Sequence, residues 1–173
     1  MGEFIGQSGI KHVSQPADSE LCFAAIVSAV DGGSPVQGIH QALVESGISA
    51  EDGSTAPPPE TTDVVLPGET VVTLEPFMGF DKSGLMEEIG KRFADGKAVA
   101  LLHKKNDNET DDRHHWILLA GQYVGGKETR VSIGDPLKAS GDVVNSSEIS
   151  DKISRTVEFS GAAFACTVSV EQP

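Results

Sequence analysis

The ten residues 21–30, LCFAAIVSAV, decide the fold because they are apolar nearly all the way round a helical turn. A surface helix keeps one polar face, so this helix is predicted to be central and buried. Residues 18–20, DSE, offer a cap and an acidic first turn ahead of it, and residues 31–33, DGG, end it. Cys22 therefore falls in the first turn of a buried helix.

Two further helices are expected nearby in the chain. Ser34 can cap the first and Pro35 suits its opening turn, while Gly47 ends it. Ser83 begins the second, which carries apolar residues at helical spacing and closes near Gly96. The first half of the chain is thus predicted to be mainly helical.

Strand patterns dominate the second half. Strands are predicted at 98–103, 116–124, 129–133, 156–159 and 163–170, with shorter candidates at 64–66 and 71–74. The turn Gly125-Gly126-Lys127 joins two of them as a hairpin. This order predicts an α+β fold with N-terminal helices packed against a C-terminal antiparallel β-sheet. We expect one domain over residues 1–173, with an irregular N-terminal segment at 1–14.

Charge and composition exclude some classes of function. The 173 residues carry a formal charge of −13, which disfavours nucleic acids and anionic membranes as partners. No apolar run reaches the length of a membrane span, and no signal peptide is visible at the start. We expect a monomer that acts on a protein or peptide, with no nucleic acid and no membrane as partner. Localisation stays open, with secretion or export as one option.

The two cysteines lie in different settings. A cysteine attacks as its thiolate, and the unpaired N–H groups of a helix N-terminus stabilise that anion. Cys22 has this position, although a cysteine in an apolar run is more often a packing residue. Cys166 falls in an alternating strand pattern and is expected to be a small buried hydrophobe.

A histidine and an acid come from the predicted hairpin. His115 enters the strongly apolar strand 116–124, and Asp135 ends the next strand. An antiparallel pair can therefore place the carboxylate beside the imidazole, where it would orient the ring and stabilise its charged form. Each residue alone has a common structural explanation, since Asp135-Pro136 is also a frequent turn opening.

Together these pieces resemble the papain-like cysteine peptidases, nearest the bacterial branches that include bacteriocin-leader-processing peptidase domains and secreted effector peptidases. The matching stretches are Gln15, LCFAA at 21–25, DGKAVAL at 95–101, HWILLAG at 115–121 and VSIGDP at 131–136. Phe23 stands where the family commonly has Trp or Gly. The resemblance covers about residues 15–137 and lies in order and spacing.

The resemblance implies a papain-like fold and a catalytic triad of Cys22, His115 and Asp135. Gly121 follows His115 at the family's spacing, which favours His115 over its neighbour His114 as the base. The resemblance also implies that Gln15 donates to an oxyanion hole with the Cys22 backbone N–H. The activity implied is peptide-bond hydrolysis through a thioester, with no cofactor and no metal.

Three alternatives stay open. His103, His114, His115 and nearby aspartates could bind a metal, but they lack the close ligand pairs that zinc prefers. Cysteine–histidine sites also catalyse deamidation and acyl transfer, because these reactions begin with attack on a similar carbonyl. The scaffold could instead be a catalytically inactive binding module.

Overall fold

The predicted α+β class is confirmed. The computed structural model describes residues 3–16, 20–104 and 114–171. Within these ranges it has four helices and eight strands that form one antiparallel sheet. The bounds of the helices are α1 Cys22–Asp31, α2 Val36–Glu45, α3 Lys82–Ala94 and α4 Ser146–Ser160. The bounds of the strands are β1 Glu3–Gly6, β2 Thr62–Val65, β3 Val71–Gly79, β4 Ala98–Lys104, β5 His114–Val124, β6 Arg130–Gly134, β7 Asp142–Asn145 and β8 Ala163–Glu171.

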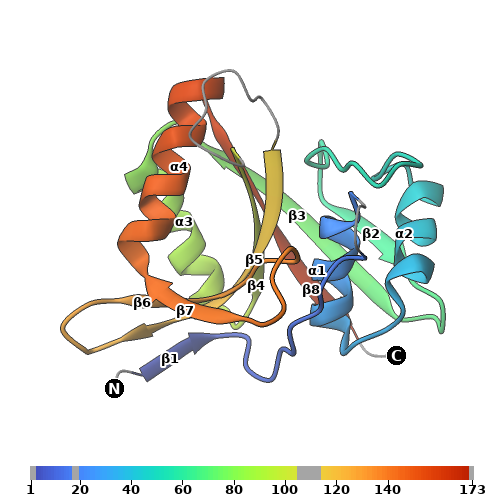
Figure 1. The fold of residues 1–173 in the computed structure, drawn as a ribbon, viewed down its shortest axis with the longest axis horizontal. Helices are drawn as coiled ribbons and strands as arrows, with labels where there is room; N and C mark the ends of the chain where they lie inside the picture. The colour runs from blue at the N-terminus through green and yellow to red at the C-terminus, as the bar shows by residue number, and fades with distance from the viewer. Residues whose placement is uncertain (1–2, 17–19, 105–113, 172–173) are drawn as a thin grey trace.

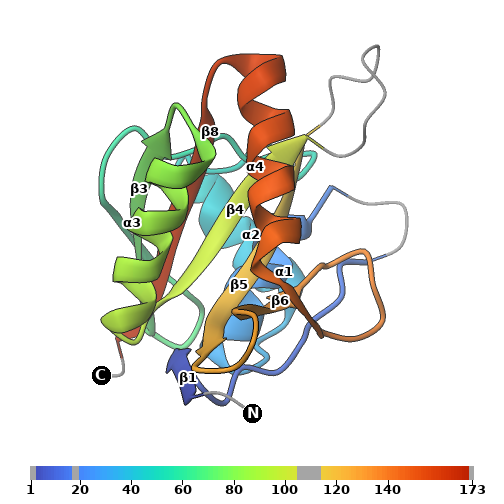
Figure 2. The same ribbon diagram turned by 90° about the vertical axis from the view of Figure 1, so that its left-hand side faces the viewer.

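The sheet separates two layers of helices. Its strands follow the order β2-β3-β8-β4-β5-β6-β7, and β1 pairs with β5 outside this path. Helices α1 and α2 lie on one face, whereas α3 and α4 lie on the other (Figures 1 and 2). Each face therefore has its own hydrophobic core, the first built around Phe23 and Trp116 and the second around Phe93 and Ile117.

Helix α1 is the buried centre of the first core, as its composition predicts. Cys22 through Val30 are all buried. Gly32 ends the helix with a left-handed backbone, φ 102°, and its N–H donates to the Ser28 carbonyl. A glycine adopts this conformation without strain, and this explains the stop after Asp31. The expected cap and acidic first turn are wrong, because Leu21 is the N-cap of α1 and its first turn carries no acidic residue. Residues 18–19 themselves lie outside the described residues.

Strand β5 runs through the middle of the sheet and carries the predicted histidine. It pairs with β4 along its first half and with β1 along its last residues. A side chain at Gly121 would place its Cβ 2.6 Å from the Ile5 carbonyl oxygen, so the close approach of β1 requires glycine there. The expectation that 1–14 is wholly irregular is therefore wrong at Glu3–Gly6.

Other differences concern the second half of the chain. The predicted strand at 156–159 is wrong, because these residues form the last turns of α4. Ile149 and Ile153 recur at helical spacing on its buried face, and this pattern outweighs the local preference for a strand. Helices are consequently not confined to the N-terminal half. Strand β7 was not predicted either.

The second helix also begins differently from the expectation. Ser34 does not cap α2, since its hydroxyl donates to the Asp31 carboxylate instead, and Pro35 occupies the capping position. The hairpin between β5 and β6 forms as predicted, with Gly125 at φ 92° in the turn. No helix in the described ranges is both long and apolar enough to cross a bilayer.

Candidate active site

Cys22 is the first residue of α1, in the position that the sequence predicts. Leu21 precedes it as the N-cap and supplies no side-chain hydrogen bond to the helix. The N–H groups of the first turn thus keep their partial positive charge close to the sulfur. Phe23 anchors this end, because its ring meets Trp116 of β5 edge to face, with centroids 4.9 Å apart. Cys22 as a residue is 8% exposed, so it is nearly buried.

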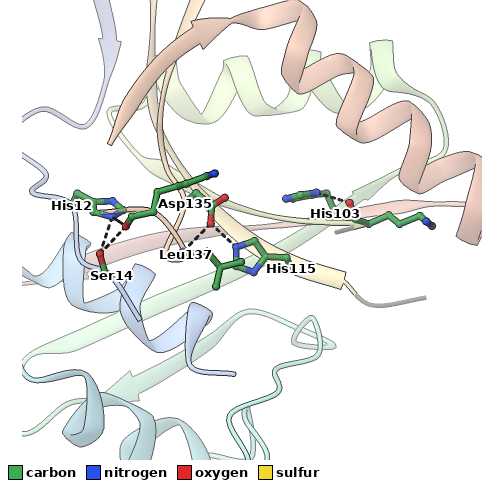
Figure 3. Close-up of polar contacts among 8 residues, drawn as sticks. His12, Ser14, His103, His115, Asp135 and Leu137 are labelled. Carbon is green, nitrogen blue, oxygen red and sulfur yellow. Dashed lines mark hydrogen bonds and ion pairs between the residues drawn. The ribbon is translucent and has the colours of Figure 1, made fainter. Parts of the chain in front are cut away.

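The β5–β6 hairpin brings His115 and Asp135 together, as the sequence predicts. Leu118 of β5 pairs with Gly134 at the end of β6, so Asp135 follows the ladder directly. The Nε2–H of His115 donates to Asp135 Oδ1 over 2.6 Å (Figure 3). This short distance is typical of a hydrogen bond between charged partners.

The two groups hold each other in their charged forms. Burial disfavours a charged ring at His115, but hydrogen bonds and charges from Asp135 and Cys22 outweigh it and raise the pKa of His115 to about 9. Burial likewise opposes ionisation of Asp135. The hydrogen bonds from His115 and from the backbone N–H of Leu137 outweigh it and lower the pKa of Asp135 to about 2. At neutral pH the pair is imidazolium and carboxylate.

The sulfur of Cys22 acts on the same ring. Hydrogen bonding with Cys22 and the charge of its thiolate form both favour protonated His115. Since Nε2 is committed to Asp135, Nδ1 is the nitrogen that remains for the sulfur. The three predicted residues therefore form one constellation in the order sulfur, imidazole, carboxylate.

The N-terminal segment fastens the loop that carries Asp135. The Nε2–H of His12 and the hydroxyl of Ser14 both donate to the Lys138 carbonyl, each over 2.7 Å (Figure 3). The backbone N–H of Gln15 donates to the Pro136 carbonyl over 2.9 Å. We call residues 12–15 the strap. No partner for His12 can be predicted from the sequence, because Lys138 lies 126 positions away in the chain.

The strap places the Gln15 backbone beside the loop of Asp135, and the oxyanion role of its side chain stays a prediction. If its carboxamide donates to the oxyanion, Gln15→Ala should lower kcat by about 100- to 1000-fold with little change in KM. The matched control is Gln7→Ala. Gln7 also lies in the N-terminal segment, but its backbone N–H donates to the Ala120 carbonyl and not to the loop of Asp135. Initial rates and melting temperatures should be measured for both variants. If the two variants keep the same melting temperature and lose the same amount of activity, Gln15 has no specific role in catalysis.

A cleft of about 450 Å³ opens beside Cys22. Its walls come from the loop 54–57, from β4, β5 and β8, and from the end of α4. The loop is tied to the sheet because the indole N–H of Trp116 donates to the Thr55 carbonyl over 2.9 Å. Trp116 thus belongs both to the first hydrophobic core and to the wall of the cleft. His115 and Asp135 lie outside the lining of this cleft.

His114 faces a different environment from His115. It lines the cleft, its Nε2 lies 3.3 Å from the Ser160 hydroxyl, and its ring packs near Phe159 of α4. The preference for His115 as the base agrees with this geometry, because His115 is the histidine that bonds to Asp135. His114 is placed to contact whatever enters the cleft.

His103 is a neighbour of the site that the sequence singled out only as a possible metal ligand. It lies opposite His115 in the β4–β5 register, with ring centroids 5.9 Å apart. The ring is buried and its Nδ1–H donates to the Lys104 carbonyl, while Nε2 is buried without a hydrogen-bond partner. Burial, reinforced by the charge of Lys152, lowers the pKa of His103 to about 3. The ring next to His115 is therefore neutral.

Because His103 is neutral in the fold, the free energy of unfolding should decrease as the pH is lowered. Its pKa is about 3 in the fold and ordinarily 6.5, so between these values only the unfolded chain takes up the proton. The free energy of unfolding should fall by about 2 kcal/mol from pH 6.5 to 4.5 through this group. His103→Phe should remove that part of the slope in urea titrations at both pH values. An unchanged slope in the variant would contradict the assignment.

Cys166 differs from Cys22 in its surroundings and in its reactivity. Cys22 and Cys166 are both free thiols, and Cys166 is fully buried with its pKa raised by burial to about 12. Cys166 is therefore unreactive in the fold. No cluster of three metal-ligating side chains occurs among the residues that the structure describes. The aspartates between His103 and His114 lie outside the described residues.

No family model matches the sequence, and comparison with curated proteins finds no significant match. The chemistry of the site therefore has to be inferred from the geometry around Cys22.

Proposed function

We propose that the chain is a papain-like cysteine peptidase that hydrolyses peptide bonds through Cys22, His115 and Asp135. The observation that carries the proposal is that one imidazole interacts with both a carboxylate and a helix-terminal sulfur. An ion pair that only stabilises the fold does not require a nearby thiol, and a cysteine that only packs in the core does not require a nearby imidazole. Their combination is the arrangement that activates a thiol nucleophile.

Catalysis would proceed in two halves. The Cys22 thiolate attacks the carbonyl carbon, and the tetrahedral oxyanion is bound by the Cys22 backbone N–H and the Gln15 carboxamide. The C–N bond breaks as His115 gives its proton to the leaving amine, leaving a thioester. Water then attacks the thioester, His115 takes a proton from it, and the acid and the thiolate are released. Asp135 keeps the ring oriented throughout.

The cleft supports a polypeptide as substrate. It adjoins the sulfur and combines apolar walls, such as Leu102 and Phe164, with polar groups such as Ser54 and Glu20. A cleft of this kind suits a side chain that flanks the attacked bond. A peptide bond also needs no cofactor to be cleaved by a thiolate.

The decisive experiment combines labelling with a digest. Iodoacetamide should alkylate Cys22 in the folded protein faster than a denatured thiol, and Cys166 only after unfolding. A peptide library is then incubated with the protein, and the products are weighed by mass spectrometry. Fragments support a peptidase, whereas a gain of about one dalton without cleavage would indicate a deamidase, because an amide has become an acid. Slow labelling of Cys22 would indicate an inactive binding module.

A further inference from the structure

Four apolar side chains stand next to one another across the end of the sheet that holds the candidate site. They come from neighbouring strands, and each is the direct cross-strand partner of the next. In order from β5 to β3 they are Trp116, Leu102, Phe164 and Met78. Directly opposed residues of antiparallel strands point to the same face of the sheet. We call these four residues the apolar row.

The apolar row becomes more exposed with distance from β5. Trp116 is 2% exposed, Leu102 and Phe164 are half-buried, and Met78 is 43% exposed. The first three also line the cleft beside Cys22, and Met78 lies one strand beyond its lining. The apolar surface therefore does not stop at the cleft but continues onto β3.

The length of the apolar row suits a short extended peptide. Neighbouring strands lie about 4.8 Å apart, so three gaps between strands span about 14 Å. An extended chain rises about 3.3 Å per residue, so about four residues would cover this distance. Alternate side chains of such a chain point to the same side. Two side chains, two positions apart, would contact the row.

We propose that the apolar row binds the substrate segment beside the bond that Cys22 attacks, and that it selects extended segments with apolar side chains at alternate positions. This inference rests on the peptidase function proposed above. The occupant is the substrate itself, because three of the four residues border the cleft that contains the sulfur. A permanent partner seated on them would block Cys22.

The test uses three thiol reagents of graded size. Iodoacetamide has no peptide part, so its rate measures only the reactivity of the Cys22 sulfur. A four-residue peptide chloromethyl ketone with leucine at two alternate positions adds both apolar contacts, and its partner has glycine in place of the leucine farther from the ketone. The thiolate displaces chloride, so each labelling event forms one C–S bond. On the wild-type protein the two-leucine ketone should label Cys22 about tenfold faster than its partner, as expected for one partly buried leucine.

Substitutions at the far end of the apolar row identify where that gain arises. Met78→Ser should abolish the tenfold difference, and Met78→Leu should keep it. The matched control is Val65→Ser, since Val65 is an exposed apolar residue, 62% accessible, on the edge strand β2. This control should keep the difference too. All variants should react equally with iodoacetamide, because neither Met78 nor Val65 lines the cleft beside Cys22 and this small reagent does not reach the far end of the row.

Two results would overturn the inference, and they are distinguishable. Rapid labelling by iodoacetamide with equal rates for the two ketones, or with a difference that survives Met78→Ser, rejects the apolar row and leaves the peptidase proposal standing. Labelling by iodoacetamide no faster than that of a denatured thiol rejects the peptidase proposal, and the substrate role of the row with it.

Discussion

Cys22→Ala is expected to reduce peptide hydrolysis by at least about 10⁴-fold while the fold is retained. The sulfur is the only atom in the constellation that can form the thioester, so no neighbouring group can take over its part. The variant removes one small, nearly buried group at the start of α1, and the helix keeps its other contacts. Initial rates and melting temperature should be measured on the same preparations.

The matched control is Cys166→Ala, which removes the second free thiol from the core. It should leave the rate constants nearly unchanged, even where it lowers the melting temperature. Retained turnover in Cys22→Ala would reject the nucleophile. A catalytic loss confined to Cys166→Ala would point to a different thiol chemistry altogether.

His115→Ala should cause a loss of similar size, and His114→Ala a much smaller one. Without His115 the thiolate loses its counter-ion and the leaving amine loses its proton donor, so about 10³- to 10⁴-fold is expected in kcat. His114 lines the cleft, whereas His115 bonds to Asp135, so removal of His114 should act mainly on KM. A larger loss in His114→Ala than in His115→Ala would show that His114 is the base and that the assignment to His115 is wrong.

The same histidine is expected to set the alkaline limit of the proposed activity. The pKa of His115 is raised to about 9, so the imidazolium persists through neutral pH and is lost as the pH passes 9. The rate kcat/KM should therefore fall above about pH 9. Asp135→Asn should move this alkaline fall in kcat/KM to lower pH, because the variant lacks the carboxylate that stabilises the charged ring. If kcat/KM of the variant falls at the same pH as that of the wild type, Asp135 does not stabilise the charged ring.

The central elements could be predicted because their signals are local. The helix at 21–30 has too few polar residues to lie at a surface, and the β5–β6 turn is marked by paired glycines. Adjacent strands joined by a short turn must pair, so the meeting of His115 and Asp135 followed from the sequence alone.

What escaped prediction depends on contacts between distant segments. The neighbour of His115 on β4 could not be named, because the connection between β4 and β5 is long and leaves their register open. Residues 156–159 look like a strand in isolation, and only the buried face of α4 as a whole identifies a helix. The cleft combines the loop 54–57 with the end of α4, which no local pattern links.

The strap has a consequence for how the site comes into being. Its bonds join His12 and Ser14 to Lys138, partners separated by 126 and 124 positions. During synthesis the strap leaves the ribosome well before Lys138, so its anchor does not yet exist when the strap emerges. The strap therefore reaches its native contacts late, and a nascent chain that already contains α1 still lacks the loop that carries Asp135.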